Sequence, residues 1–197
     1  MQSSEIEQLI KIINRLPNMG ERSAHKIVVH LLNRKNTVME NLLLTLTDVY
    51  KKSTTCRICN NICTSPICDI CSDQKRDKSI ICVVASISDL WFIERAGFYG
   101  GVYHVLGGKL SAVEGVRPED LDIQKLKQRI AEEIVAEVII AMSADIDGQT
   151  TMFFVKDYIK NAPVKITTLS HGMPIGGDFD YLDEGTIIAA FSNRRDL

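Results

Sequence analysis

Residues 56–71 read CRICNNICTSPICDIC and contain five of the chain's six cysteines. Two tetrapeptides of the form Cys-x-Ile-Cys, 56–59 and 68–71, stand eight residues apart. A Cys-x-x-Cys turn directs two sulfur atoms at one point, so two such turns offer the four thiolates that a tetrahedral zinc ion needs. The predicted ligands of one structural zinc ion per chain are Cys56, Cys59, Cys68 and Cys71. Cys63 belongs to neither pair.

A site filled by four sulfur atoms leaves no open position for water, which argues against Lewis-acid catalysis at this ion. Disulfides, an iron site and unligated thiols are the alternatives. Disulfides are disfavoured because nothing indicates an oxidising compartment. No run of about 18 apolar residues could span a bilayer, and the first residues, MQSSEIEQ, lack a basic-then-apolar signal pattern. We therefore expect a cytoplasmic protein with reduced thiols and no membrane association.

Charge is divided unevenly along the chain. Of its 197 residues, 45% are apolar and 24% are charged, which suits an ordinary soluble protein of one or two domains. Residues 1–80 carry 12 Lys and Arg against 8 Asp and Glu, whereas residues 81–197 carry 11 against 17. An anionic partner such as nucleic acid would meet the first half, although a plain solvated helical surface can show the same excess.

The first 52 residues predict three helices. Ser3 or Ser4 can cap the first, and the segments 21–33 and 37–52 repeat its apolar spacing of three and four residues. Between the first two helices, residues 16–20 read LPNMG, where Pro17 ends a helix and Gly20 permits a turn that a side chain would block.

This segment resembles the helix-hairpin-helix motif of DNA-binding proteins, with Asn18 in place of the motif's first glycine. Such a hairpin points backbone N–H groups at a phosphate, where the helix dipole also favours an anion. The predicted DNA contacts are Gly20, Arg22 and Lys26, with Arg15 flanking them, and they would hold the phosphate backbone independently of sequence. A helical hairpin that only packs against its neighbour is the alternative.

From residue 80 the pattern changes to short β-rich runs that alternate with helices. The expected strands are 80–84, 102–106, 135–142 and 165–169, and the expected helices are 89–96, 122–133, 149–160 and 183–191. Strand and helix in turn imply a parallel sheet covered on both faces. Cys82, inside the first strand, is expected to be a small buried apolar residue.

The loops after the first and third of these strands resemble those of a Toprim domain, the module of topoisomerases and primases. That module places a glutamate after its first strand and an Asp-x-Asp pair after a later one to hold Mg²⁺. Asp145 and Asp147 match the pair, but Ala85 stands in the position of the glutamate, and a methyl group neither transfers a proton nor binds a metal. The two carboxylates could hold Mg²⁺ weakly through water, bind a partner, or cap the helix that starts near Gly148.

Taken in order, the hairpin, the cysteine finger, the Toprim-like sheet and a glycine-rich loop at 170–178 resemble the bacterial recombination mediator family RecR over nearly the entire chain. The predicted fold is an α+β chain of several parts. These are a helix-hairpin-helix region (1–54), a four-cysteine zinc finger (55–78), a Toprim-like α/β domain with a parallel sheet (79–175), and a C-terminal loop and helix (176–197).

The resemblance implies a non-enzymatic role in recombinational DNA repair. Members of this family act with RecO, and in many bacteria RecF, to load the RecA recombinase onto single-strand gaps. They form dimers or a ring-shaped tetramer, with the hairpin regions lining the hole and the Toprim domain facing RecO. Two rival classes stay open: a Toprim-type Mg-dependent nuclease or primase-like enzyme, and a zinc-finger adaptor that binds only proteins.

Overall fold

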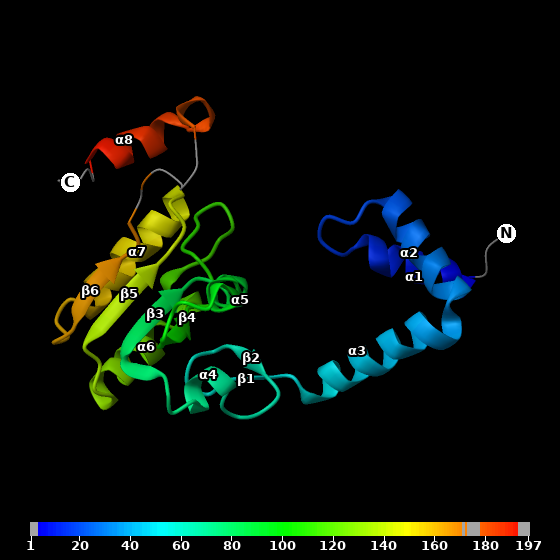
Figure 1. Cartoon of the computed structure of the whole chain (residues 1–197), viewed down its shortest axis with the longest axis horizontal. Helices are drawn as coiled ribbons and strands as arrows, with labels where there is room; N and C mark the ends of the chain where they lie inside the picture. The colour runs from blue at the N-terminus through cyan, green and yellow to red at the C-terminus, as the bar shows by residue number, and fades with distance from the viewer. Residues whose placement is uncertain (1–3, 171, 173–177, 193–197) are drawn as a thin grey trace. The chain divides into compact units, whose positions relative to one another are not determined.

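The computed structural model describes residues 4–170, 172 and 178–192 (Figure 1). The chain divides into two units, Met1–Ser53 and Thr54–Leu197. Most of the glycine-rich loop expected at 170–178 lies outside the described residues, and the division into four domains stays a prediction. None of the described helices combines the length and the apolar character that crossing a membrane requires.

The first unit begins with a helical hairpin. Its helices α1 (Ser4–Asn14) and α2 (Glu21–Asn33) pack together through buried Ile10, Ala24 and Val28. Ala24 and Val28 are four residues apart, so they fall on one face of α2, as the apolar spacing predicts. The predicted order of helix, tight turn and helix is confirmed.

Asn18, and not Gly20, is the residue of this turn that needs an unusual backbone conformation. Asn18 has a φ of +59°, in the left-handed region that asparagine tolerates better than most residues. Gly20 has a φ of −83°, and a Cβ added to it would meet no atom within 4 Å. The prediction that Gly20 permits a turn closed to other residues is therefore wrong.

The third helix follows a short π-helical segment, Lys35–Met39. The α-helix itself, α3 (Glu40–Lys52), begins three residues later than predicted, and none of its residues is buried. Four of its leucines are 43–64% exposed, namely Leu42, Leu43, Leu44 and Leu46. The apolar spacing that predicts this helix therefore does not mark a face buried within the chain.

The second unit is built on a parallel sheet of four strands in the order β4-β3-β5-β6. The strands are β3 (Asp77–Val84), β4 (Gly101–Val105), β5 (Glu137–Ala141) and β6 (Lys165–Thr168). Its helical elements beyond the cysteine segment are α5 (Ile87–Ala96), η2 (Pro118–Asp120), α6 (Ile123–Glu132), α7 (Ile146–Ile159), η3 (Phe179–Tyr181) and α8 (Glu184–Ser192). Strand and helix alternate along the chain, which confirms the predicted sheet.

Both faces of the sheet are covered by helices. Ile81 and Val83 of β3 point to the face covered by α6 and α7, while Cys82 and Val84 point to the face covered by Leu90 of α5. This alternation follows from the two-residue period of a strand. Burial raises the pKa of Cys82 to about 12, so this thiol is the buried apolar residue that the sequence predicts.

The strand order places two loops beside each other. The chain adds β4 on one side of β3 and then crosses back to add β5 on the other side. The carboxyl ends of β3 and β5 therefore lie at a topological switch point, where open α/β sheets usually bind ligands. Ala85 follows β3 and Asp145 follows β5, so the Toprim-like residues meet at this edge.

The four-cysteine segment forms a small lobe against the edge strand β4. It contains the two-stranded antiparallel pair β1 (Thr54–Thr55) and β2 (Ile62–Cys63) and the short helix α4 (Asp69–Ser72). The Cys59 carbonyl accepts a hydrogen bond of 2.9 Å from the Val105 N–H. This bond joins the lobe directly to the sheet.

Burial of His104 in β4 predicts that the stability of the second unit depends on pH. Its side chain is fully buried, Nε2 lies 2.9 Å from the Asp122 carbonyl oxygen, and Nδ1 finds no partner among the described residues. Burial is the main cause that lowers the pKa of His104 from 6.5 to about 4, and the positive charges of Arg129 and Lys125 add to it. Between about pH 4 and pH 6.5 the unfolded chain is therefore expected to bind a proton at this residue that the folded chain does not. Stability should fall as the pH drops from about 6.5 to about 4, with a contribution approaching 1.4 kcal/mol per pH unit.

The measurement is urea unfolding of the native protein and the His104→Phe variant at several pH values between 7 and 4.5. His104→Phe should be less stable at pH 7, yet lose less stability on acidification. Acid release of a bound metal affects both proteins and so does not alter the difference. His30→Phe, at an exposed position, should keep the native pH dependence. Equal slopes for the native protein and His104→Phe would contradict this assignment.

Candidate metal centre and nucleic-acid interface

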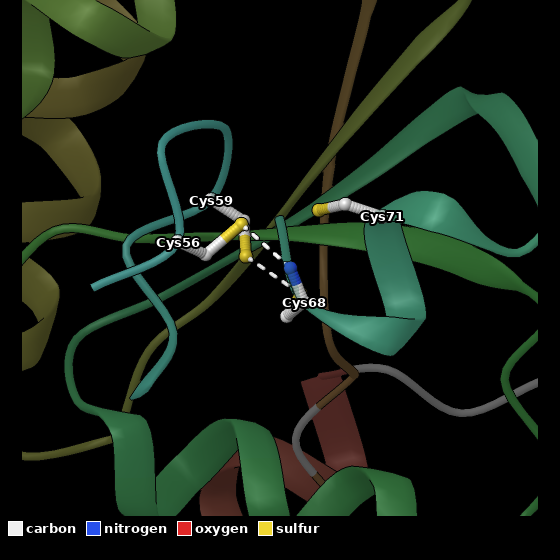
Figure 2. A group of neighbouring side chains, drawn as sticks. All are labelled: Cys56, Cys59, Cys68 and Cys71. Carbon is white, nitrogen blue, oxygen red and sulfur yellow. Dashed lines mark hydrogen bonds between the residues drawn. The ribbon is translucent and has the colours of Figure 1, made fainter. Parts of the chain in front are cut away.

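The four predicted metal ligands converge in one buried cluster. Their Sγ atoms all lie within 4.8 Å of one another, and each residue is at most 5% exposed. Figure 2 shows Cys56 and Cys59 on one loop, with Cys68 and Cys71 approaching them from the start and the body of α4. A tetrahedral ion with metal–sulfur distances of about 2.3 Å has sulfur–sulfur edges of roughly 3.8 Å, so the cluster is compatible with zinc.

Local backbone geometry sets up this convergence. The Cys56 carbonyl accepts a hydrogen bond from the Asn60 N–H (3.1 Å), and the Cys56 N–H donates to the Asn61 carbonyl (2.7 Å). Asn60 takes a φ of +65°, which closes the turn after Cys59. The Cys68 N–H in turn donates to the Cys56 Sγ at 3.3 Å, a backbone bond to sulfur that links the two Cys-x-x-Cys segments.

The cluster needs a cation if all four sulfur atoms are to be thiolates. A hydrogen bond from Cys71 is the main cause that lowers the pKa of Cys59 to about 5, whereas burial raises the pKa of Cys68 to about 11. Metal binding requires deprotonated thiols and supplies the compensating positive charge. Cys63 is half-buried, lies outside the cluster and donates from Sγ to the Ser65 carbonyl at 2.9 Å.

The start of α2 presents cations beside a helix N-terminus that has no side-chain cap. Gly20 is the N-cap residue and has no side-chain oxygen to accept a hydrogen bond from the first N–H groups of the helix. Arg22 and Lys26 are exposed and one helical turn apart, and Arg15 is exposed before the hairpin turn. Among the described residues, the ion pairs involve none of these three cations. This arrangement can bind a phosphate through N–H groups, the helix dipole and positive side chains.

At the carboxyl edge of the sheet, Asp145 is the N-cap of α7, one of the roles that the sequence leaves open. Its Oδ1 accepts a hydrogen bond of 2.6 Å from the Gly148 N–H. Its Oδ2 lies 2.6 Å from the Lys109 ammonium, which holds the pKa of this carboxyl below its usual value. Gly148 packs so closely that a Cβ would collide with the Ser143 carbonyl.

These residues do not fit a Toprim magnesium site. Ala85 supplies no ligand, and both oxygens of Asp145 already accept bonds, one of them from a cation. Asp147, in the first turn of α7, is the remaining carboxylate of the predicted pair. Lys109 is the residue that sequence reasoning missed. It precedes Asp145 by 36 positions, and no local spacing marks the contact.

Comparison with family models matches three stretches of the chain. Residues 6–50 match the family model "RecR, helix-hairpin-helix", residues 79–170 match "Toprim domain", and residues 172–195 match "RecR, C-terminal". These matches confirm the predicted fold class.

Curated relatives are similar over almost the full length. The chain is 47% identical over 195 residues to "Recombination protein RecR" of Novosphingobium aromaticivorans, covering 99% of this chain and 98% of the relative. It is 45% identical over 191 residues to the protein of the same name in Parvibaculum lavamentivorans, covering 97% and 96%. With the hairpin, the cysteine cluster and the Toprim sheet present in one chain, this protein belongs to the RecR family of recombination proteins.

Proposed function

We propose that this chain is a DNA-binding mediator of recombinational repair that acts with RecO and RecF to load RecA onto single-strand gaps. The observation that carries the proposal is the similarity to proteins named "Recombination protein RecR" over 97–99% of the chain. The working parts are a phosphate-binding hairpin, a structural zinc ion and a Toprim domain that serves as a docking surface for partner proteins.

DNA binding is supported by the first unit. Between residues 11 and 57 the chain carries nine basic residues against three acidic ones. Exposed Arg22 and Lys26 stand beside an N-terminus of α2 that lacks a side-chain cap. Because these groups suit a phosphate and not a base edge, the proposed binding is independent of sequence.

A role without catalysis is supported by the composition of the Toprim site. The position expected to carry a general acid or metal-binding glutamate is Ala85, which is 7% exposed. Asp145 is engaged by Lys109 and by the backbone of α7. A nuclease or primase mechanism would lack both its proton carrier and an open set of metal ligands.

We also propose that the chain assembles into a ring-shaped tetramer, as the family resemblance implies, and α3 supports the part of this proposal that concerns self-association. The exposed leucines of this helix form an apolar surface that water covers in the isolated chain, and such surfaces usually mark protein–protein contacts. We propose that copies of this chain cover α3 in the oligomer.

The zinc proposal predicts that Cys68→Ser abolishes metal binding and disrupts the cysteine lobe. Structural zinc contributes roughly 10–16 kcal/mol in small zinc-binding peptides, as much as the whole stability of a typical domain. Mass spectrometry of the purified native protein should find one zinc ion per chain, and Cys68→Ser should contain almost none. Limited proteolysis should then cut the variant within residues 54–72.

Cys63→Ser is the matched control, because it removes the neighbouring thiol that lies outside the cluster. It should keep one zinc ion per chain and resist proteolysis like the native protein. Full zinc content in Cys68→Ser would show that the assigned ligand set is wrong.

The hairpin proposal predicts that Arg22→Ala combined with Lys26→Ala weakens DNA binding. Removing two phosphate contacts should reduce the affinity for single-stranded DNA by about tenfold or more at roughly 50 mM salt. The slope of log K against log salt concentration should become shallower by about 1.4. Fluorescence anisotropy with a labelled oligonucleotide at several salt concentrations measures both quantities.

Lys51→Ala combined with Lys52→Ala is the charge-matched control, at the exposed end of α3. This variant should retain most of the affinity. Equal losses in the two double variants would indicate binding by overall charge, and unchanged binding in both would show that the start of α2 is not the DNA contact. Absence of DNA binding by the native protein at about 50 mM salt would favour the protein-only adaptor.

The assembly proposal predicts that Leu42→Glu combined with Leu46→Glu lowers the oligomeric state. Charged side chains at two apolar positions one helical turn apart should prevent burial of α3. Light scattering after gel filtration should give the mass of a smaller species. Asn41→Glu combined with Thr45→Glu adds the same charge to exposed polar positions of the same helix and should leave the mass unchanged. A native mass for the leucine variant would contradict the role of α3.

A further inference from the structure

A lysine side chain lies where the Toprim-like edge would otherwise offer carboxylates to a divalent cation. Lys109 belongs to the segment between β4 and η2, and its Nζ lies 2.6 Å from Asp145 Oδ2. The same ammonium donates to the Ser143 Oγ at 3.2 Å. Two oxygen atoms from the loop after β5 therefore accept hydrogen bonds from the Lys109 ammonium group.

Each carboxylate oxygen of Asp145 already accepts a hydrogen bond. Oδ1 receives the Gly148 N–H at 2.6 Å, and this bond caps α7. Oδ2 receives the ammonium of Lys109. A magnesium ion needs oxygen ligands at about 2.0–2.1 Å in a near-octahedral shell, so it would have to approach an oxygen that already accepts the lysine and to sit beside a positive charge. Both requirements oppose binding of the ion.

The backbone beside Lys109 is anchored, which keeps the lysine at this position. The Leu110 N–H donates to the Thr151 Oγ1 at 2.8 Å, and that hydroxyl donates to the Asp147 carbonyl at 2.6 Å. Thr151 is fully buried in α7. The segment that carries the lysine is thus bound to the same helix whose N-terminus carries both aspartates.

We propose that the Lys109 ammonium is the resident cation of this Toprim edge, taking the place of a divalent metal and making the site independent of Mg²⁺. The proposal goes beyond the proposed function, since it concerns the charge balance of one site and not DNA binding. Ala85 fits this picture, because a site that holds a univalent cation of its own needs fewer carboxylates than one that holds a divalent ion.

The test is to remove the charge of Lys109 and ask whether a divalent cation replaces it. The zinc-loaded native protein should show no saturable Mn²⁺ binding by electron paramagnetic resonance at millimolar concentrations. Lys109→Met should gain one Mn²⁺ site with a Kd on the order of 1 mM or tighter, in the range of weak carboxylate sites. Mg²⁺ at about five times its Kd should then raise the thermal midpoint of Lys109→Met by roughly 2–4 °C without affecting the native protein.

Two further variants assign the gained site. Lys109→Arg keeps the positive charge and should behave like the native protein. Lys109→Met combined with Asp145→Asn should lose the new site while keeping the helix cap, because asparagine also caps helices. Saturable Mn²⁺ binding by the native protein at this edge, lost in Asp145→Asn, would overturn the proposal. So would Lys109→Met that binds no Mn²⁺, or that binds it equally well with Asn at position 145.

Discussion

Strand β4 lies at the edge of the sheet, and side chains from three different segments of the second unit donate hydrogen bonds to its outward-facing carbonyl groups. Alternate residues of this strand turn their carbonyl groups away from β3, and an unpaired strand edge invites pairing with another chain. Each of these carbonyls accepts a hydrogen bond: Gly101 from Arg76 (3.3 Å), Tyr103 from Arg129 (2.7 Å) and Val105 from Asn60 (2.9 Å). Because Asn60 belongs to the cysteine lobe and Arg129 to α6, this edge joins lobe, sheet and helix.

The edge of β4 also links the four-cysteine cluster to the sheet, because Cys59 and Asn60 both bond to Val105. Apart from the cysteines themselves, the core of the lobe contains only the partly buried Ile58 and Ile70 among the described residues. A core of this size does not fix a backbone without a cross-link. The ion would therefore hold Cys59 and Asn60 in the positions from which they bond to Val105. A structural metal bound by the four cysteines would in this way help to keep the hydrogen bonds along the β4 edge in place.

The sequence predicts the parts of this molecule that depend on local spacing, and it misses those that depend on contacts between distant residues. The four cysteines and the alternation in β3 follow from short-range periodicity, and both are present in the structure. In the hairpin turn the left-handed conformation lies at Asn18 and not at Gly20, because composition gives the presence of a turn but not which residue takes positive φ. Helical spacing in α3 predicts an apolar face but not what covers it. No local spacing marks Lys109, because its partner lies 36 residues further along the chain.

The two units thus use charge in different ways. In the first unit, Arg22 and Lys26 have no ion-pair partner among the described residues, so their charge is available to an external anion. In the second unit, Lys109 forms an ion pair with Asp145, so a carboxylate of the same chain balances its charge. A covalently attached cation cannot exchange with solvent and polarises a substrate less than a divalent ion does. Under the proposal made above for Lys109, this Toprim edge would keep the strand order of the domain without holding a divalent ion, an arrangement that would suit a surface that docks other proteins.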